Sequence, residues 1–186
     1  AAKAGYEALL VEREASLGGF AARLLKQFPQ TPPYRELADP VWNSLAEAVQ
    51  REPKVTVYCS STLERVEGAP GMFDVFIRKG EEVVQQRAGA IVLATGFEPY
   101  DPSRLGHLGY GKSPNVVTTV EMEDLAKGGG LKRPSDGKSA QSVAFVLCAG
   151  SRDPEHLPYC SSVCCMTALK QALYVRQASA EAKVFI

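Results

Sequence analysis

Short apolar runs separated by amphipathic and glycine-rich stretches follow one another along this chain, and the pattern predicts a mixed α/β fold. Continuous apolar runs at residues 7–11, 88–96 and 141–147 have strand length and predict strands buried on both faces, as in a parallel sheet. Between the first two runs, apolar and polar residues alternate with period two. This alternation predicts an antiparallel meander made of residues 54–60, 62–68, 72–80 and 81–87.

Helices are predicted around these strands. Residues 1–4 read as the end of a helix closed by Gly5, and the turn SLGGF opens a helix over residues 21–28. Apolar residues of the segment 41–51 share one helical face. A connector rich in glycine and proline follows over residues 97–139 and contains the helix-like stretch VEMEDLAKGGG.

The last helix is expected over residues 161–178, and residues 182–186 read as the beginning of a strand. The chain also starts within a helical segment that has no N-cap residue. We therefore expect this sequence to be a piece of a longer polypeptide.

Composition limits the classes of function. A chain of 186 residues can bury one domain, or one domain and part of another. Lys plus Arg and Asp plus Glu both total 21, and this zero net charge argues against a nucleic-acid partner. No apolar run approaches the roughly 20 residues of a transmembrane helix. Five cysteines, four of them clustered, do not suit a secreted disulfide framework, so a cytoplasmic protein is expected.

Three signals in the first half of the chain are typical of flavin-binding proteins. Glu12 follows an apolar strand, where a carboxylate can accept hydrogen bonds from an adenosine ribose. Gly18 and Gly19 allow the backbone to pass close to a pyrophosphate or a flavin. Thr95 and Gly96 close the apolar run that follows the meander. In this order, the signals resemble the FAD domain of the two-dinucleotide-fold flavoproteins, the pyridine-nucleotide–disulfide oxidoreductase group.

A glycine-rich G-x-G-x-x-G loop is absent from this sequence. In dinucleotide-binding folds, that loop places backbone N–H groups and a helix N-terminus on the pyrophosphate. We expect it to lie just before Ala1 in the longer polypeptide, so this chain alone lacks one element of a flavin site.

Four cysteines lie within 18 residues, in the pattern C-x11-C-x3-C-C: Cys148, Cys160, Cys164 and Cys165. The first ends an apolar strand, and the other three surround the expected start of the last helix, with Cys160 at its cap. A helix N-terminus stabilises thiolates, which are the form that binds metals. Four thiolates suit a [4Fe–4S] cluster.

Three other interpretations stay open. Zinc also binds four cysteines, although its sites usually use two separated cysteine pairs. A vicinal disulfide between Cys164 and Cys165, or a redox dithiol of Cys160 and Cys164, is a second alternative. Inert thiols are the third. No Ser/His/Asp set and no paired carboxylates are evident, so we assign no catalytic residue for proton transfer.

The stretch CAGSRDPEHLPYCSSVCCMTALKQALYVRQ resembles the cluster-binding region of HdrA, the flavoprotein of heterodisulfide reductase. Together with AGYEALLVEREASLGGFAARL, VEGAPGMFDV and ATGFEPYDPSRLGHLGYGKSPNVVT, it is more similar still to the HdrA-like flavoproteins of the quinone-interacting membrane-bound oxidoreductase complex of sulfur metabolism, particularly the one designated B. The sequence departs from HdrA because it has neither the ferredoxin-like insertion nor the extra cysteine motif of that protein.

This resemblance implies an FAD near Glu12, Gly18, Gly19, Thr95 and Gly96. It also implies a [4Fe–4S] cluster bound by the four cysteines of the C-x11-C-x3-C-C pattern. The implied partners are a sister flavin and iron–sulfur protein, a membrane protein that reacts with quinone, and adenylylsulfate reductase. Those partners would hold the protein at the cytoplasmic face of the membrane.

The predicted fold is therefore part of a two-dinucleotide-fold, Rossmann-like flavoprotein with an antiparallel β-meander. Residues 1–139 are expected to form an FAD-type domain without its first strand and glycine loop, and residues 140–186 to begin a second dinucleotide-type domain that carries the cysteines. The predicted function is electron transfer between FAD and the cluster in an oxidoreductase complex, while the piece alone is expected to be inactive. The alternatives are a zinc-stabilised docking module and a dithiol oxidoreductase.

Overall fold

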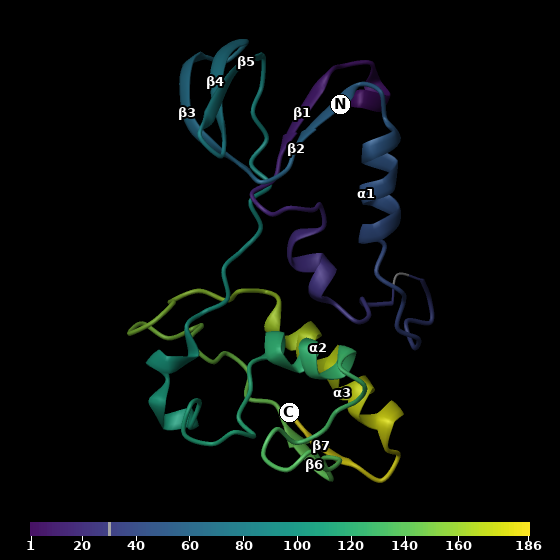
Figure 1. Cartoon of the computed structure of the whole chain (residues 1–186). Helices are drawn as coiled ribbons and strands as arrows, with labels where there is room; N and C mark the ends of the chain where they lie inside the picture. Colours follow the sequence, from purple (N-terminus) through teal and green to yellow (C-terminus); the bar gives the residue numbers. More distant parts are fainter. Residues whose placement is uncertain (30) are drawn as a thin grey trace. The chain divides into compact units, whose positions relative to one another are not determined.

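The computed structural model describes residues 1–29 and 31–186 and has a mixed α/β fold (Figure 1). Its residues form two compact units. The first comprises residues 1–22 and 41–97, and the second comprises residues 23–40 and 98–186. The predicted division into 1–139 and 140–186 stays a prediction.

A parallel strand pair and a helix form one part of the first unit. Strand β1 (Ala8–Val11) pairs in parallel with β2 (Val55–Tyr58), with Ala8 opposite Val55. Helix α1 (Trp42–Arg51) precedes β2 in the chain, and a short 3-10 helix (Ala2–Ala4) precedes β1. Gly5 ends that 3-10 helix in the left-handed conformation, as its glycine predicted.

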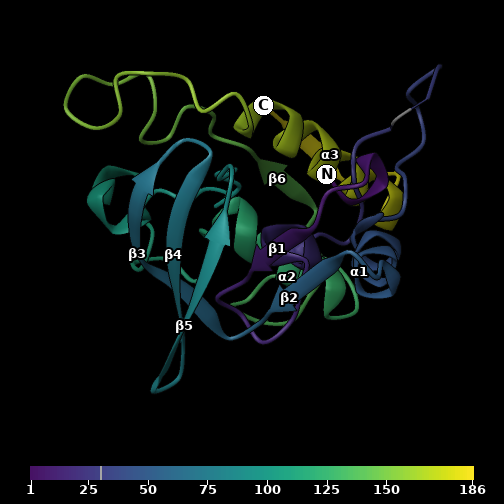
Figure 2. The same ribbon diagram turned by 90° about the horizontal axis from the view of Figure 1, so that it is seen from above.

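An antiparallel meander forms the rest of the first unit, with the strand order β3–β4–β5 (Figure 2). Its strands are β3 (Ser61–Ala69), β4 (Met72–Lys79) and β5 (Glu82–Ala88). Val75 and Ile77 of the central strand are buried. The meander was predicted, but the segment 54–60 was wrongly included in it, since β2 pairs in parallel with β1.

The predicted buried strand over residues 88–96 is wrong beyond Ala88. Residues 90–100 have no regular secondary structure, and Val92 and Leu93 are 87% and 81% exposed. A strand needs a hydrogen-bonded neighbour, and no described strand pairs with this run. The apolar pattern showed that the segment suits burial, but it could not show that a neighbouring strand is present.

The second unit contains two helices and a parallel strand pair. Helix α2 (Thr119–Lys127) packs on helix α3 (Cys164–Ala178), and β6 (Ser142–Ala144) pairs in parallel with β7 (Lys183–Phe185). Its core contains Met122, Val175 and Ala182, with partly buried apolar residues packed around them. The remaining short 3-10 helices of the described chain are Gly19–Arg23, Pro102–Arg104 and Gly106–Leu108.

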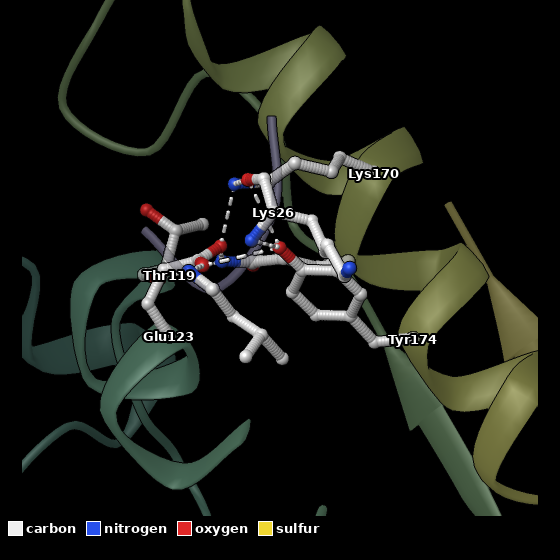
Figure 3. Close-up of polar contacts among 7 residues, drawn as sticks. Lys26, Thr119, Glu123, Lys170 and Tyr174 are labelled. Atoms are coloured by element: carbon white, nitrogen blue, oxygen red, sulfur yellow. Dashed lines mark hydrogen bonds and ion pairs between the residues drawn. The ribbon is translucent and has the colours of Figure 1, made fainter. Parts of the chain in front are cut away.

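The helix predicted over residues 21–28 is wrong, since only a 3-10 helix (Gly19–Arg23) forms there. The reason is visible in Figure 3, where the backbone after this turn bonds to side chains of the two helices. The Leu25 N–H donates to Glu123 Oε2 at 2.9 Å, and the Lys26 N–H donates to Tyr174 Oη at 3.0 Å. These tertiary bonds take the place of intrahelical bonds.

The last helix begins at Cys164, three residues later than expected. Cys160 is therefore not its cap, and Val163 occupies that position without a side-chain hydrogen bond. The predicted strand over 141–147 is shortened to β6, because its pairing with β7 ends at the bond from the Phe145 N–H to the Phe185 carbonyl, and the chain then turns at Cys148, whose φ is +56°. No helix of the described residues is both long enough and apolar enough to cross a bilayer.

We expect the substitution Thr118→Ala to lower the free energy of unfolding by about 1 kcal/mol. The Thr118 side chain caps α2 by accepting from the Glu121 N–H at 3.2 Å, and the Glu121 carboxylate accepts from the Thr118 N–H at 2.6 Å. Urea unfolding measures the change. Thr119→Ala, at the next and exposed position, is the control, and an equal loss in both variants would contradict the capping role.

Candidate functional site

The loop between the first two clustered cysteines is closed by its own backbone hydrogen bonds. The Ser151 N–H donates to the Cys148 carbonyl at 3.0 Å, and the Arg152 N–H donates to the Tyr159 carbonyl at 3.0 Å. Because Tyr159 directly precedes Cys160, these bonds bring the two ends of the loop, and so Cys148 and Cys160, toward one another.

The other two cysteines occupy the first turn of α3. Cys164 is the first residue of the helix and Cys165 the second. The first backbone N–H groups of a helix have no partner within it, and they carry the positive end of the helix dipole. Cys164 is half-buried, and Cys165 is exposed. Because both residues lie at the N-terminus of α3, the helix dipole favours negative charge on their sulfurs.

The backbone of Cys148 acts directly on the sulfur of Cys164. A hydrogen bond from the Cys148 N–H lowers the pKa of the Cys164 thiol, against the opposing effect of burial, and Ser161 and Cys165 lower it further. The turn at Cys148 and the start of α3 are thus in contact through this sulfur. A thiol with a lowered pKa is in the form that attacks electrophiles or binds metals.

The neighbouring thiol is affected in the opposite direction. The Cys164 side chain raises the pKa of the Cys165 thiol through its hydrogen bond and its charge, and the charges of Cys148 and Cys160 add to the effect. The Ser162 N–H donates to the Cys160 sulfur at 3.4 Å. The other three thiols of the cluster are therefore near enough to Cys165 to raise its pKa.

The donor set fits an iron–sulfur cluster in its chemistry. The chain supplies four free thiols, from a turn, a closed loop and a helix start, and one of them is predisposed to ionise. Among the described residues, no three cysteine, histidine, aspartate or glutamate side chains are already arranged around a common metal position. The ligand assignment to these four cysteines stays a prediction.

An aromatic contact that the sequence did not reveal supports the loop. The Tyr100 ring lies against the backbone of Gly150, where an added Cβ would be 2.4 Å from Tyr100 Cδ1. Tyr100 Oη is 2.5 Å from His156 Nδ1, and the two rings meet edge to face. Gly150 is buried with a φ of +79°. The only sequence signal was this glycine within the cysteine loop.

Glu12 directly follows β1, as its position after an apolar strand predicted. Its backbone N–H donates to the Tyr58 carbonyl at 2.9 Å, which continues the parallel pairing. Its carboxylate accepts from the Glu14 N–H at 3.0 Å. The side chain is only half-buried, so a ribose hydroxyl can compete for this carboxylate.

The two glycines that follow have different roles. An added Cβ at Gly18 would lie 2.8 Å from Trp42 Cε3, so glycine is required there for packing against α1. An added Cβ at Gly19 would meet nothing within 4 Å. Gly19 therefore leaves open space beside its backbone, which a bound group can occupy.

The structure brings the second predicted flavin segment close to the first. The Phe20 and Phe97 rings have centroids 4.6 Å apart, and each phenylalanine directly follows a glycine, Gly19 or Gly96. Gly96 has a φ of +71°, and an added Cβ there would also meet nothing within 4 Å. Thr95 is exposed beside it. The arrangement fits a flavin-type cofactor, while the residue assignment stays a prediction.

Residues 106–113 match the pattern G-x4-G-K-S of phosphate-binding loops, but their structure excludes that role. Such a loop needs free backbone N–H groups between a strand and a helix. Here the N–H groups of Lys112 and Ser113 both donate to the Gly109 carbonyl at 3.0 Å, and a 3-10 helix (Gly106–Leu108) occupies the start of the motif.

The chain is similar in sequence to HdrA proteins of the heterodisulfide reductases. It is 43% identical over 111 residues to an HdrA iron–sulfur protein of the CoB–CoM heterodisulfide reductase of Methanopyrus kandleri, an alignment that covers 56% of this chain and 17% of that protein. It is 26% identical to the corresponding iron–sulfur protein of Methanocaldococcus jannaschii over 98% of this chain and 40% of that protein. The chain thus spans less than half the length of these relatives.

Other comparisons add little. No known family profile matches the chain. The L-proline dehydrogenase of P. horikoshii is similar in structure over 96% of this chain and 30% of its own, with a TM-score of 0.46 and 13% identity. That similarity is too slight to support a functional assignment.

We expect Gly150→Ala to destabilise the protein by about 1–3 kcal/mol more than Gly137→Ala, because the new methyl group overpacks against the Tyr100 ring. Both glycines have similar φ values, +79° and +69°, but Gly137 faces open space. Urea unfolding measures both variants. Introducing Gly150→Ala into a protein that already carries Tyr100→Ala should lower the free energy of unfolding less than introducing it into the wild-type protein. No such rescue would refute the contact.

In the reduced, metal-free protein, Cys164 should be alkylated at lower pH than Cys165. The pKa of Cys164 is lowered and that of Cys165 is raised, so the reactive thiolate of Cys164 appears first as the pH rises. Mass spectrometry after timed iodoacetamide treatment, from about pH 6 to 10, gives the rate at each site. If both rates had the same pH midpoint, the predicted asymmetry would be disproved.

Proposed function

We propose that this chain is part of an oxidoreductase component that passes electrons between FAD and a [4Fe–4S] cluster. The observation that carries the proposal is the contact between Cys148 and Cys164. The backbone of Cys148 stabilises the thiolate of Cys164, so that the turn after β6 and the start of α3 meet at one sulfur. The relatives, which are named as iron–sulfur proteins of heterodisulfide reductase, support the same assignment.

The ligands of the cluster would be Cys148, Cys160, Cys164 and Cys165. When bound, the cluster supplies one-electron redox chemistry, which no side chain here provides. The chain's own residues hold the thiolates in place. The closed loop positions Cys148 and Cys160, and the start of α3 positions the other two. The Cys148 N–H stabilises negative charge on the Cys164 sulfur, and the Ser162 N–H does so on the Cys160 sulfur.

The flavin would lie beside the two open glycine turns of the first unit. Gly19 and Gly96 offer backbone that is free of side-chain contacts, and Gly18, Thr95 and the Glu12 carboxylate lie close to them in the chain. Small residues at such turns let a cofactor approach the main chain.

We further propose that the full-length protein works within a multi-component complex related to heterodisulfide reductase. A relative from Methanothermobacter marburgensis, 38% identical over 109 residues, is named as one component of an H2:CoB–CoM heterodisulfide, ferredoxin reductase. The sequence resemblance favours the quinone-interacting complex of sulfur metabolism, with a sister flavoprotein, a membrane protein and adenylylsulfate reductase as partners. A cytoplasmic position at the membrane face follows from that proposal.

Anaerobic reconstitution of the full-length protein tests the proposed function. We expect bound FAD together with iron and sulfide in equal amounts. Cys160→Ala should lose the iron and keep the flavin, because the two groups are held by different residues. Cys59→Ala, a cysteine directly after β2 and outside the cluster, is the matched control and should keep both.

Other results would select among the alternatives. One zinc ion in a colourless protein would favour the docking module, and thiol–disulfide exchange without iron would favour the dithiol enzyme. Iron that persists unchanged in Cys160→Ala would refute the ligand assignment.

A further inference from the structure

A buried network of charged and polar groups joins α2 to α3 (Figure 3). Lys170 Nζ lies 2.9 Å from Glu123 Oε1, and each side chain is only 2% exposed. Gln171 Nε2 donates to the same carboxylate oxygen at 2.8 Å, and Tyr174 Oη donates to Glu123 Oε2 at 3.2 Å. Three residues of α3 thus converge on one residue of α2.

The same network holds a third segment of the chain. The Lys26 carbonyl accepts from Lys170 Nζ at 2.9 Å and lies 3.2 Å from Tyr174 Oη, whose one hydrogen it shares with Glu123, while the Leu25 N–H donates to Glu123. This segment begins a few residues after the Gly18–Gly19 turn. Burial and the charge of Glu123 raise the pKa of Tyr174, which keeps its hydroxyl available as a donor.

The position of the network along α3 relates it to the cysteines. Lys170 follows Cys164 by six residues, about 9 Å along the helix axis. Gln171 follows Cys164 by seven residues, two full turns, and so shares its face of the helix. The Oε1 atom of Gln171 is buried and has no partner within the described residues. A rotation or slip of α3 would therefore move its thiols and break several buried contacts at once.

We propose that Glu123 and Lys170 are positioning residues that set the register of α3 and, as a neutral pair, keep an unpaired buried charge from acting on Cys164 and Cys165. This inference rests on the proposed cluster. A buried ion pair is neutral as a whole, so it imposes little net charge on a neighbouring group, whereas either partner alone imposes a full charge in a medium of low dielectric constant. Cluster potentials respond to net charge and to hydrogen bonding around the sulfurs.

Midpoint potentials of the cluster in the full-length, anaerobically reconstituted protein test this proposal. Lys170→Met leaves a buried carboxylate and should make the potential more negative. Glu123→Gln leaves a buried ammonium group and should make it more positive. The double variant Glu123→Gln/Lys170→Met removes both charges and should return toward the wild-type value. If one single variant fails to fold, the sign of the other single variant's shift relative to the double variant still tests the proposal, since a neutral pair avoids an unpaired buried charge.

Asp124→Asn is the matched control, because Asp124 is the next residue of α2 and pairs with Arg23 at 2.5 Å on an exposed surface. Its potential should not change. A merely structural role of the network would lower iron content in both single variants without shifts of opposite sign. If the two single variants keep the cluster but shift its potential in the same direction, or not at all, this inference is overturned and the proposed function still stands. A wild-type protein that assembles no cluster would overturn both the inference and the proposed function.

Discussion

The second unit depends on one constraint, that charges removed from water must be paired. Glu123 and Lys170 are nearly inaccessible, and their attraction is supplemented by Tyr174, Gln171 and the backbone of residues 25 and 26. Removing one partner from such a pair leaves a buried charge, which costs several kcal/mol, about 3–5 in typical cases. The pair therefore specifies a single arrangement of α2, α3 and the segment after the 3-10 helix (Gly19–Arg23). Apolar packing by Met122 and Val175 adds stability but is less selective in register.

The cysteine region is built on that arrangement. Helix α3 presents Cys164 and Cys165 at its first turn, and the loop from Cys148 to Cys160 is held by its own backbone bonds and by the Tyr100 ring against Gly150. The two parts meet where the Cys148 N–H contacts the Cys164 sulfur. An iron–sulfur site needs this kind of support, because thiolates repel one another until a metal neutralises them.

The flavin-type features lie in the first unit and have a different physical basis. There the chain offers backbone without side chains, at Gly19 and Gly96, and the Phe20–Phe97 contact brings the two turns together. Val92 and Leu93, just before the second turn, stay exposed because the described strands provide no neighbour for them. The relation to HdrA is consistent with both units, although the chain covers only part of that protein's length.

The sequence alone determined the α/β class, the meander, helices α1 and α2, the final strand and the clustering of the cysteines, because each depends on local periodicity, turn residues or spacing. Tertiary structure decided the rest. The run 90–96 stays outside any strand, residues 24–28 leave the helical path because Glu123 and Tyr174 bind their N–H groups, and α3 starts at Cys164 rather than near Cys160. The Glu123–Lys170 pair and the Tyr100–Gly150 contact join residues far apart in the chain. No local pattern marks such pairs, since their energy exists only once the chain has brought them together.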